Sequence, residues 1–153
     1  ATTEIYTLSL HDALPIFSGE GYASGGAVTV LNTVSPGDVT NTPAALFADN
    51  LTLANGSTYR WDRSVSENDV IHAGALTLGG ALTLDFGRAS GHPISDSFRT
   101  VIATYDTLNG AANLANWTIV NAGGQGYVTE LTAANGEIVL NYIARRGTLM
   151  ILR

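Results

Sequence analysis

The stretch ALTLGGALTLDFG, residues 75–87, contains two nearly identical segments separated by Gly79 and Gly80. Successive residues of a β-strand point to opposite faces, so residues of equal parity share one face. The odd positions carry small or polar side chains, and the even positions are apolar: Leu76, Leu78, Leu82, Leu84 and Phe86. The pattern predicts two β-strands whose apolar face continues across the glycine pair.

The glycine pair decides how these two strands are connected. A two-residue hairpin there would pair even positions with odd ones and mix the two faces, which disfavours it. Two geometries keep the leucines on one face. One is a three-residue hairpin over residues 79–81, and the other is a corner at which the chain bends and continues around the wall of a β-solenoid.

A second copy of the pattern favours the corner. LTLANGSTYRWD, residues 51–62, aligns without a gap on LTLGGALTLDFG, residues 76–87, at a constant offset of 25 residues. Apolar residues fall on apolar ones, so that Trp61 aligns with Phe86. One rung of a solenoid cannot bury its inner face alone and stacks parallel on the next, which a constant period with a bend in each copy would provide.

The offset makes a specific prediction about neighbours. Arg60 should lie beside Asp85 on the outer face, where opposite charges could form an ion pair, and Thr52 should lie beside Thr77. The sequence therefore predicts an all-β protein built as a parallel β-solenoid. A β-sandwich or jelly roll with similar strands is the alternative.

The composition is that of one all-β domain with many turns. The 153 residues suffice to bury a core, 13% are charged, and Gly occurs 17 times. Cysteine is absent, which excludes disulfides and thiolate chemistry. The net charge is −6 and no basic stripe is present, so we expect neither nucleic acid nor an anionic membrane as a partner. No apolar run is long enough to be a transmembrane segment.

The N-terminal segment ATTEIYTLSLHDALPI, residues 1–16, differs in character from the rest of the chain. It resembles, along its whole length, the conceptual translation of a synthetic adapter used in short-read DNA sequencing libraries. We therefore expect residues 1–16 to be a non-native leader and residues 17–153 to be one β-solenoid domain, the C-terminal fragment of a longer chain. A genuine leading strand, EIYTLSL, is the alternative.

Three further segments give local predictions. GGAVTVLNTVSPGD predicts a strand over residues 27–34 that ends at the turn residues 35–38. TPAALFAD is expected to be a connecting loop because of Pro43. In YVTELTAANGEIVLNYI, the pair Asn135-Gly136 favours a type I′ turn and predicts an antiparallel hairpin cap at about residues 127–143.

The order of these motifs resembles a known family. NDVIHAGALTLGGALTLDFG (residues 68–87) followed by DSFRTVIATYDTLNG (residues 96–110) is similar to the C-terminal end of bacterial autotransporter-type passengers, including proteins with autotransporter-associated β-strand repeats. The likeness covers roughly residues 28 to 143. It implies a right-handed parallel β-helix that is secreted or displayed on the bacterial cell surface, without enzymatic activity in this part.

Candidate catalytic residues are sparse. Asp62, Glu67 and Asp69 cluster in WDRSVSENDV, but the segment lacks the acid spacing and central Gly of an EF-hand, so a solvated turn is predicted. His72, and His92 with Asp96 nearby, lack the nucleophile elbow of a Ser-His-Asp hydrolase. We therefore assign no catalytic, cofactor-binding or metal-binding residue.

Three aromatic residues could form a sugar-stacking platform: Tyr59, Trp61 and Trp117. The first two share parity with the apolar positions of their strand and are expected to be core. The sequence thus favours a non-enzymatic, adhesin-like passenger segment with surface glycans or proteins as partners. A carbohydrate-binding β module is the first alternative, which an exposed groove lined by aromatic rings would favour. A β-helical polysaccharide-active enzyme is the second, which two facing carboxylates in a cleft would favour.

Overall fold

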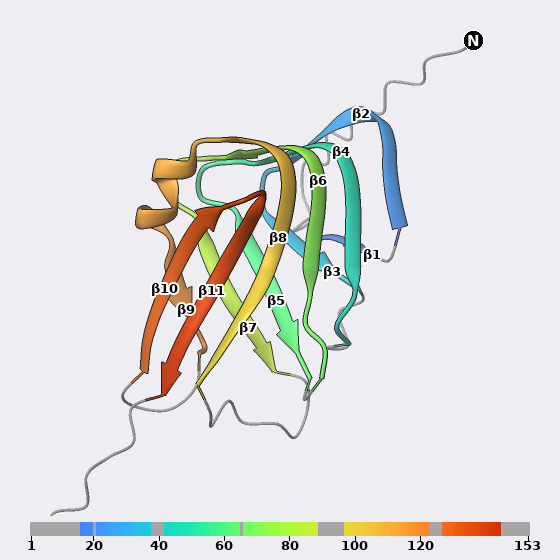
Figure 1. Ribbon diagram of the computed structural model, residues 1–153. Helices are drawn as coiled ribbons and strands as arrows, with labels where there is room; N and C mark the ends of the chain where they lie inside the picture. The colour runs from blue at the N-terminus through green and yellow to red at the C-terminus, as the bar shows by residue number, and fades with distance from the viewer. Residues whose placement is uncertain are drawn as a thin grey trace, which may run out of the picture.

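The computed structural model describes residues 16–19, 21–37, 42–64, 66–88, 97–122 and 127–144. Within these ranges the chain is all-β, with eleven strands and one short 3-10 helix, η1 (Figure 1). The elements are β1 (Ile16–Gly19), β2 (Gly21–Val30), β3 (Thr33–Pro36), β4 (Ala45–Leu53), β5 (Thr58–Arg63), β6 (Val70–Leu78), β7 (Thr83–Arg88), β8 (Phe98–Asn109), η1 (Ala111–Asn116), β9 (Thr118–Val120), β10 (Tyr127–Ala134) and β11 (Glu137–Ala144).

Consecutive strands from β1 to β9 alternate between two sheets. The five-stranded sheet has the order β1-β3-β5-β7-β9, and all its neighbours are parallel. The six-stranded sheet has the order β10-β11-β8-β6-β4-β2, parallel from β2 to β8 and antiparallel beyond. Because β6 and β7 lie in different sheets, the glycine pair between them is a corner and not a hairpin.

The predicted offset of 25 residues sets the register of β4 with β6 and of β5 with β7. Thr52 pairs with Thr77 in β4 and β6, while Trp61 pairs with Phe86 in β5 and β7. Arg60 pairs with Asp85 in the same ladder, so all three predicted neighbours are confirmed. The ion pair that the structure shows for Arg60 joins its Nε to Oδ1 of Asp62 at 4.0 Å.

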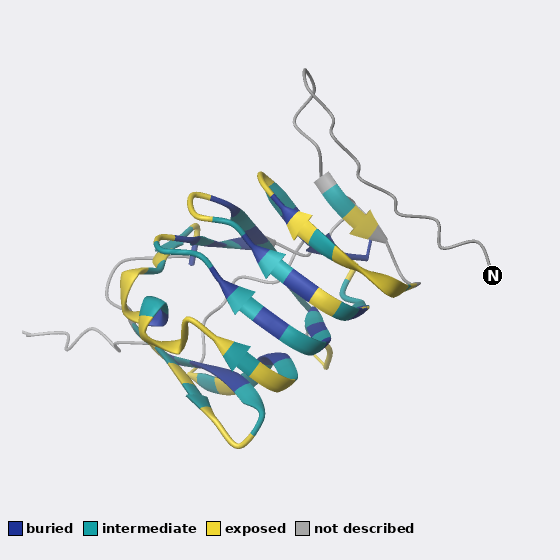
Figure 2. Cartoon of the chain, turned by 90° about the horizontal axis from the view of Figure 1, so that it is seen from above, coloured by how far each residue is buried: buried dark blue, intermediate teal, exposed yellow. Residues whose placement is uncertain are grey.

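The core lies between the two sheets and is built from aligned apolar rows. The predicted inner face is confirmed, since all five of its apolar residues are buried: Leu76, Leu78, Leu82, Leu84 and Phe86. Trp61 packs on Phe86 with ring centroids 5.0 Å apart, and the Tyr59 hydroxyl donates a hydrogen bond to the Ile102 carbonyl at 2.9 Å. Figure 2 shows the resulting alternation of buried with more exposed residues along the strands.

Strands β4 and β6 change parity in their middle, which the sequence analysis did not anticipate. The buried residues of β6 are Ile71 and Ala73 before Gly74, and Leu76 and Leu78 after it. In β4 the same change occurs at the aligned residue, Asp49. A Cβ atom at Gly74 would lie 2.8 Å from the Asp49 carbonyl oxygen, so the two strands approach closely at this bend.

Two local predictions need correction, and one element was not expected. The strand expected over residues 27–34 is broken by a bend at Leu31 and Asn32, beyond which β3 enters the other sheet. The loop expected after Pro43 is wrong, because β4 begins at Ala45 and its parallel pairing with β6 outweighs the local turn signal. The 3-10 helix η1 was not predicted.

The C-terminal hairpin is confirmed. Strands β10 and β11 pair Leu131 with Leu140, and both turn residues have positive φ angles, 54° at Asn135 and 79° at Gly136, as a type I′ turn requires. Strand β11 also pairs antiparallel with β8, so the hairpin forms one end of the six-stranded sheet.

Two further expectations concern the N-terminus and membranes. Ile16, the last residue of the expected leader, belongs to β1, and residues 1–15 lie outside the described ranges. In the described part of the chain, no helix combines the length and apolar character that crossing a membrane requires.

Candidate functional site

The three residues of the predicted acidic cluster differ in their exposure to solvent. Asp62 and Asp69 are both 0% exposed, whereas Glu67 is exposed at the turn between β5 and β6. The prediction of a solvated turn therefore holds for Glu67 and is wrong for the other two acids. A substrate in solvent cannot reach this pair. Among the described residues, no group of three His, Cys, Asp or Glu side chains is arranged to hold a metal ion.

Asp69 connects three segments of the chain through hydrogen bonds. Its carboxylate oxygens accept hydrogen bonds from the backbone N–H groups of Ala44 and Asp62, each at 2.8 Å. Its backbone carbonyl accepts the indole N–H of Trp61 at 2.9 Å. Burial raises the pKa of Asp69 to about 7, although the two N–H donors and Arg60 favour the ionised form. The residue is a structural link between β4, β5 and β6.

The three aromatic residues considered for sugar stacking also differ in their burial. Tyr59 and Trp61 are buried, which confirms that they are core. Trp117 is partly buried and lines a hollow of about 360 Å³ beside the hairpin, together with Leu131 and Glu130. His92 and Asp96 lie outside the described residues.

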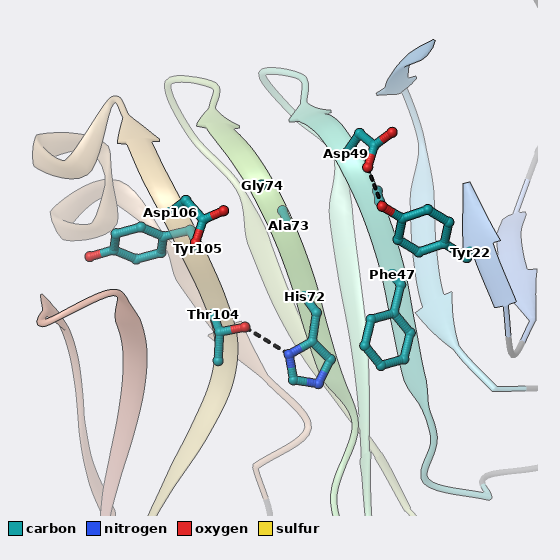
Figure 3. A pocket seen from close by; sticks show the side chains of 10 residues that line it. Tyr22, Phe47, Asp49, His72, Ala73, Gly74, Thr104, Tyr105 and Asp106 are labelled. Carbon is teal, nitrogen blue, oxygen red and sulfur yellow. Dashed lines mark hydrogen bonds between the residues drawn. The ribbon is translucent and has the colours of Figure 1, made fainter. Parts of the chain in front are cut away.

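The outer face of the six-stranded sheet carries a different group of residues, around an open hollow of about 330 Å³ (Figure 3). Four parallel strands, β2, β4, β6 and β8, contribute its lining. The lining residues are Tyr22, Phe47, Ala48, Asp49, His72, Ala73, Gly74, Thr104, Tyr105 and Asp106. We refer to this group as the outer hollow.

One row of the outer hollow consists of rings. The strand register aligns Tyr22, Phe47, His72 and Thr104 across the four strands. Phe47 stacks on His72 with centroids 4.6 Å apart and an interplanar angle of 19°, and Tyr22 lies 6.5 Å from Phe47 at 45°. The His72 Nδ1 atom shares a hydrogen bond of 2.7 Å with Thr104 Oγ1, so the row is connected from end to end.

A second row places two carboxylates on either side of a glycine. Ala48, Ala73 and Tyr105 are aligned across β4, β6 and β8, so the residues that follow them, Asp49, Gly74 and Asp106, form the next row. Two strand spacings separate the backbones at the two acids by roughly 9.6 Å. No side chain lies between them, because Gly74 occupies the middle strand.

Asp49 is held in place by two hydrogen bonds. It accepts one from the Tyr22 hydroxyl and one from the Gly25 backbone N–H, the latter at 2.7 Å. These contacts lower the pKa of Asp49, with the Gly25 N–H as the larger cause, and raise the pKa of Tyr22 through the Asp49 hydrogen bond. At neutral pH the hollow therefore contains an ionised, oriented carboxylate beside a neutral phenol.

Sequence reasoning missed the outer hollow, although a signal was present. Tyr22, Phe47 and His72 are spaced by the same offset of 25 residues that aligned the later strands. Extending that alignment upstream would have placed three rings in one row. The acid pair gave no such signal, because the offset aligns Asp49 with a glycine.

Comparisons with known proteins add no relative. No protein-family profile matches the chain, and no curated protein sequence or solved structure is significantly similar to it.

Proposed function

We propose that this chain is part of a right-handed parallel β-helix that acts as a non-enzymatic, adhesin-like passenger segment, secreted from or displayed on a bacterial cell. The observation that carries the proposal is the 25-residue register shared by β4 with β6 and by β5 with β7, in strands that alternate between two parallel sheets. A repeating rung of this kind stacks into an elongated wall. Connections between parallel strands are almost always right-handed, which supports the proposed hand.

The outer surface of the five-stranded sheet supports the same function. Thr33, Thr58, Thr83 and Thr118 are aligned across four parallel strands. Such a row presents small polar side chains at regular spacing, and neighbouring hydroxyls can form hydrogen bonds with one another. A surface of this type suits a wall that must remain soluble while it extends.

Asp69 and Asp49 each lack one property that a general acid needs. Asp69 has the raised pKa that a general acid requires, but it is buried and committed to backbone N–H groups. Asp49 is accessible, but its lowered pKa makes it a poor proton donor near neutral pH. Neither carboxyl group combines access to solvent with a suitable acidity.

Surface display of the chain tests this proposal. The full chain is inserted between a secretion signal and an outer-membrane translocator in a bacterial host, with Trp61→Ala, which disrupts the core, as a matched variant. We expect antibodies to detect the parent chain on intact cells, in a protease-resistant form, and much less of the variant. Absence from the surface of a chain that folds in solution would contradict the passenger role. Release of reducing ends from polysaccharides by the purified chain would support the enzyme instead.

A further inference from the structure

We propose that the outer hollow binds a neutral glycan, whose hydroxyls donate hydrogen bonds to Asp49 and Asp106 and whose C–H groups pack against Tyr22. The inference deepens the proposed adhesin-like function by naming its partner class. A volume of about 330 Å³ lies at the small end of the range of ligand pockets, about 300 to 1,000 Å³, and suits a mono- or disaccharide.

The polar groups of the hollow select for a ligand rich in hydrogen-bond donors. Carboxylate oxygens accept hydrogen bonds, and Asp49 and Asp106 line the hollow on opposite sides of Gly74, with the Asp49 carboxylate turned toward Tyr22 (Figure 3). Asp49 uses two acceptor positions for Tyr22 and Gly25, and a carboxylate offers about four, so it can still accept sugar hydroxyls. Because these bonds hold it before a ligand arrives, binding loses little side-chain entropy.

The rings of the hollow provide the apolar contact that a sugar also needs. Phe47 and His72 stack on each other, so they cover part of each other's faces. Tyr22 is tilted by 45° to Phe47 and is 63% exposed, which leaves a ring face open to solvent. The C–H groups of a pyranose can pack on this face while its hydroxyls reach Asp49, and a second sugar unit can reach Asp106.

Charge decides which glycans the hollow accepts. The described residues that line it include two aspartates and no Arg, and the whole chain has a net charge of −6. A sialylated, sulfated or uronic acid terminus would bring a like charge close to Asp49 and Asp106, which is unfavourable. The expected ligand is therefore a neutral hexose or N-acetylhexosamine terminus.

Binding of the purified full chain to immobilised oligosaccharides tests the inference. The probes are oligosaccharides with terminal galactose, mannose or N-acetylglucosamine and the sialylated or sulfated forms of the same structures. We expect binding of at least one neutral probe and none of its anionic form. Asp106→Asn replaces one acceptor oxygen by a donor group and Tyr22→Ala removes the ring, so each should weaken that binding about tenfold or more. Tyr22→Phe keeps the ring and should retain part of the affinity.

Glu130→Gln is the matched control, because it removes the same charge from the other hollow. Its affinity should equal that of the parent chain, and thermal melts should show that every variant is folded. The inference is overturned if no probe binds, if anionic glycans are preferred, or if Glu130→Gln loses as much affinity as the Asp106 and Tyr22 variants. It is also overturned if oligolysine binds, with an affinity that salt abolishes, and the glycans do not. Surface display is measured separately, so failure here leaves the passenger function standing.

Discussion

Two aspartates of this chain each accept two hydrogen bonds and yet have opposite acidities. Asp69, in the interior, accepts two backbone N–H groups and has its pKa raised to about 7 by burial. Asp49, on the outer face, accepts one backbone N–H and one hydroxyl, and its pKa is lowered. The difference arises because removing a carboxylate from water disfavours its charge more than two hydrogen bonds favour it. Burial therefore separates the acid that holds the fold together from the acid that can meet a ligand.

The largest expected effect concerns the interior around Asp69. Trp61 is 0% exposed, packs on Phe86 and donates its indole N–H to the Asp69 carbonyl. Trp61→Ala should lower the free energy of unfolding by about 3 to 5 kcal/mol, as measured by urea denaturation. Thr58→Ala, on the outer side of the same strand, should cost about 1 kcal/mol or less. Similar losses in the two variants would contradict the division into inner and outer faces.

The second prediction concerns the pH dependence that the buried acid imposes. The pKa of Asp69 is about 7 in the folded chain and about 3.9 when unfolded, so the folded state binds more protons between these values. The free energy of unfolding should therefore fall as the pH rises from about 4 through 7. Asp69→Asn cannot ionise, and its stability relative to the parent should increase by about 2 to 4 kcal/mol over this window.

Urea denaturation of both proteins at pH 4.5 and pH 8 measures this difference. Asp62 and Arg60 are the charged groups that act on Asp69, and both are retained in the variant, so their own contributions largely cancel. Parallel pH profiles for parent and variant would show that Asp69 is ionised throughout and that burial does not control its acidity.

The third prediction concerns the close approach beneath the outer hollow. Gly74→Ala would place a Cβ atom 2.8 Å from the Asp49 carbonyl oxygen, so β4 and β6 must move apart. We expect a loss of about 1 to 3 kcal/mol in the free energy of unfolding. Gly26→Ala is the matched control, since nothing lies within 4 Å of a Cβ atom there. Equal stability of the two variants would mean that the bend tolerates a side chain.

The smallest expected effect is that of the exposed acid. Asp49→Asn removes a carboxylate whose lowered pKa makes it a stabilising group above the pKa of an unfolded aspartate. This contribution is lost as the pH falls through the lowered folded pKa. The variant should therefore be slightly less stable than the parent at pH 7 and as stable as the parent in strong acid. Its stability relative to the parent thus falls as the pH rises, whereas that of Asp69→Asn increases. Thermal melts at pH 7 and pH 2.5 measure this, and a larger deficit in acid would refute it.

Much of the strand arrangement was predictable from local patterns. The 25-residue offset predicted that Trp61 neighbours Phe86, and the Asn135-Gly136 pair predicted the hairpin. The bend at Asp49 and Gly74 was not predicted, because the apolar alternation of residues 75–87 begins only after Gly74. The loop expected after Pro43 was wrong because pairing with β6 decided the conformation of residues that locally favour a turn.

By itself, the sequence determined the all-β class, the inner apolar face, the register of β4 with β6 and of β5 with β7, and the C-terminal turn. These features depend on side-chain alternation and turn geometry, which act between residues close together or one period apart. Only the tertiary structure decided that Asp69 is buried while Glu67 is solvated, and that Asp49 and Asp106 line one hollow on either side of Gly74. Solvation and the shape of a surface depend on which residues of several strands come together, and no single segment of the chain contains that information.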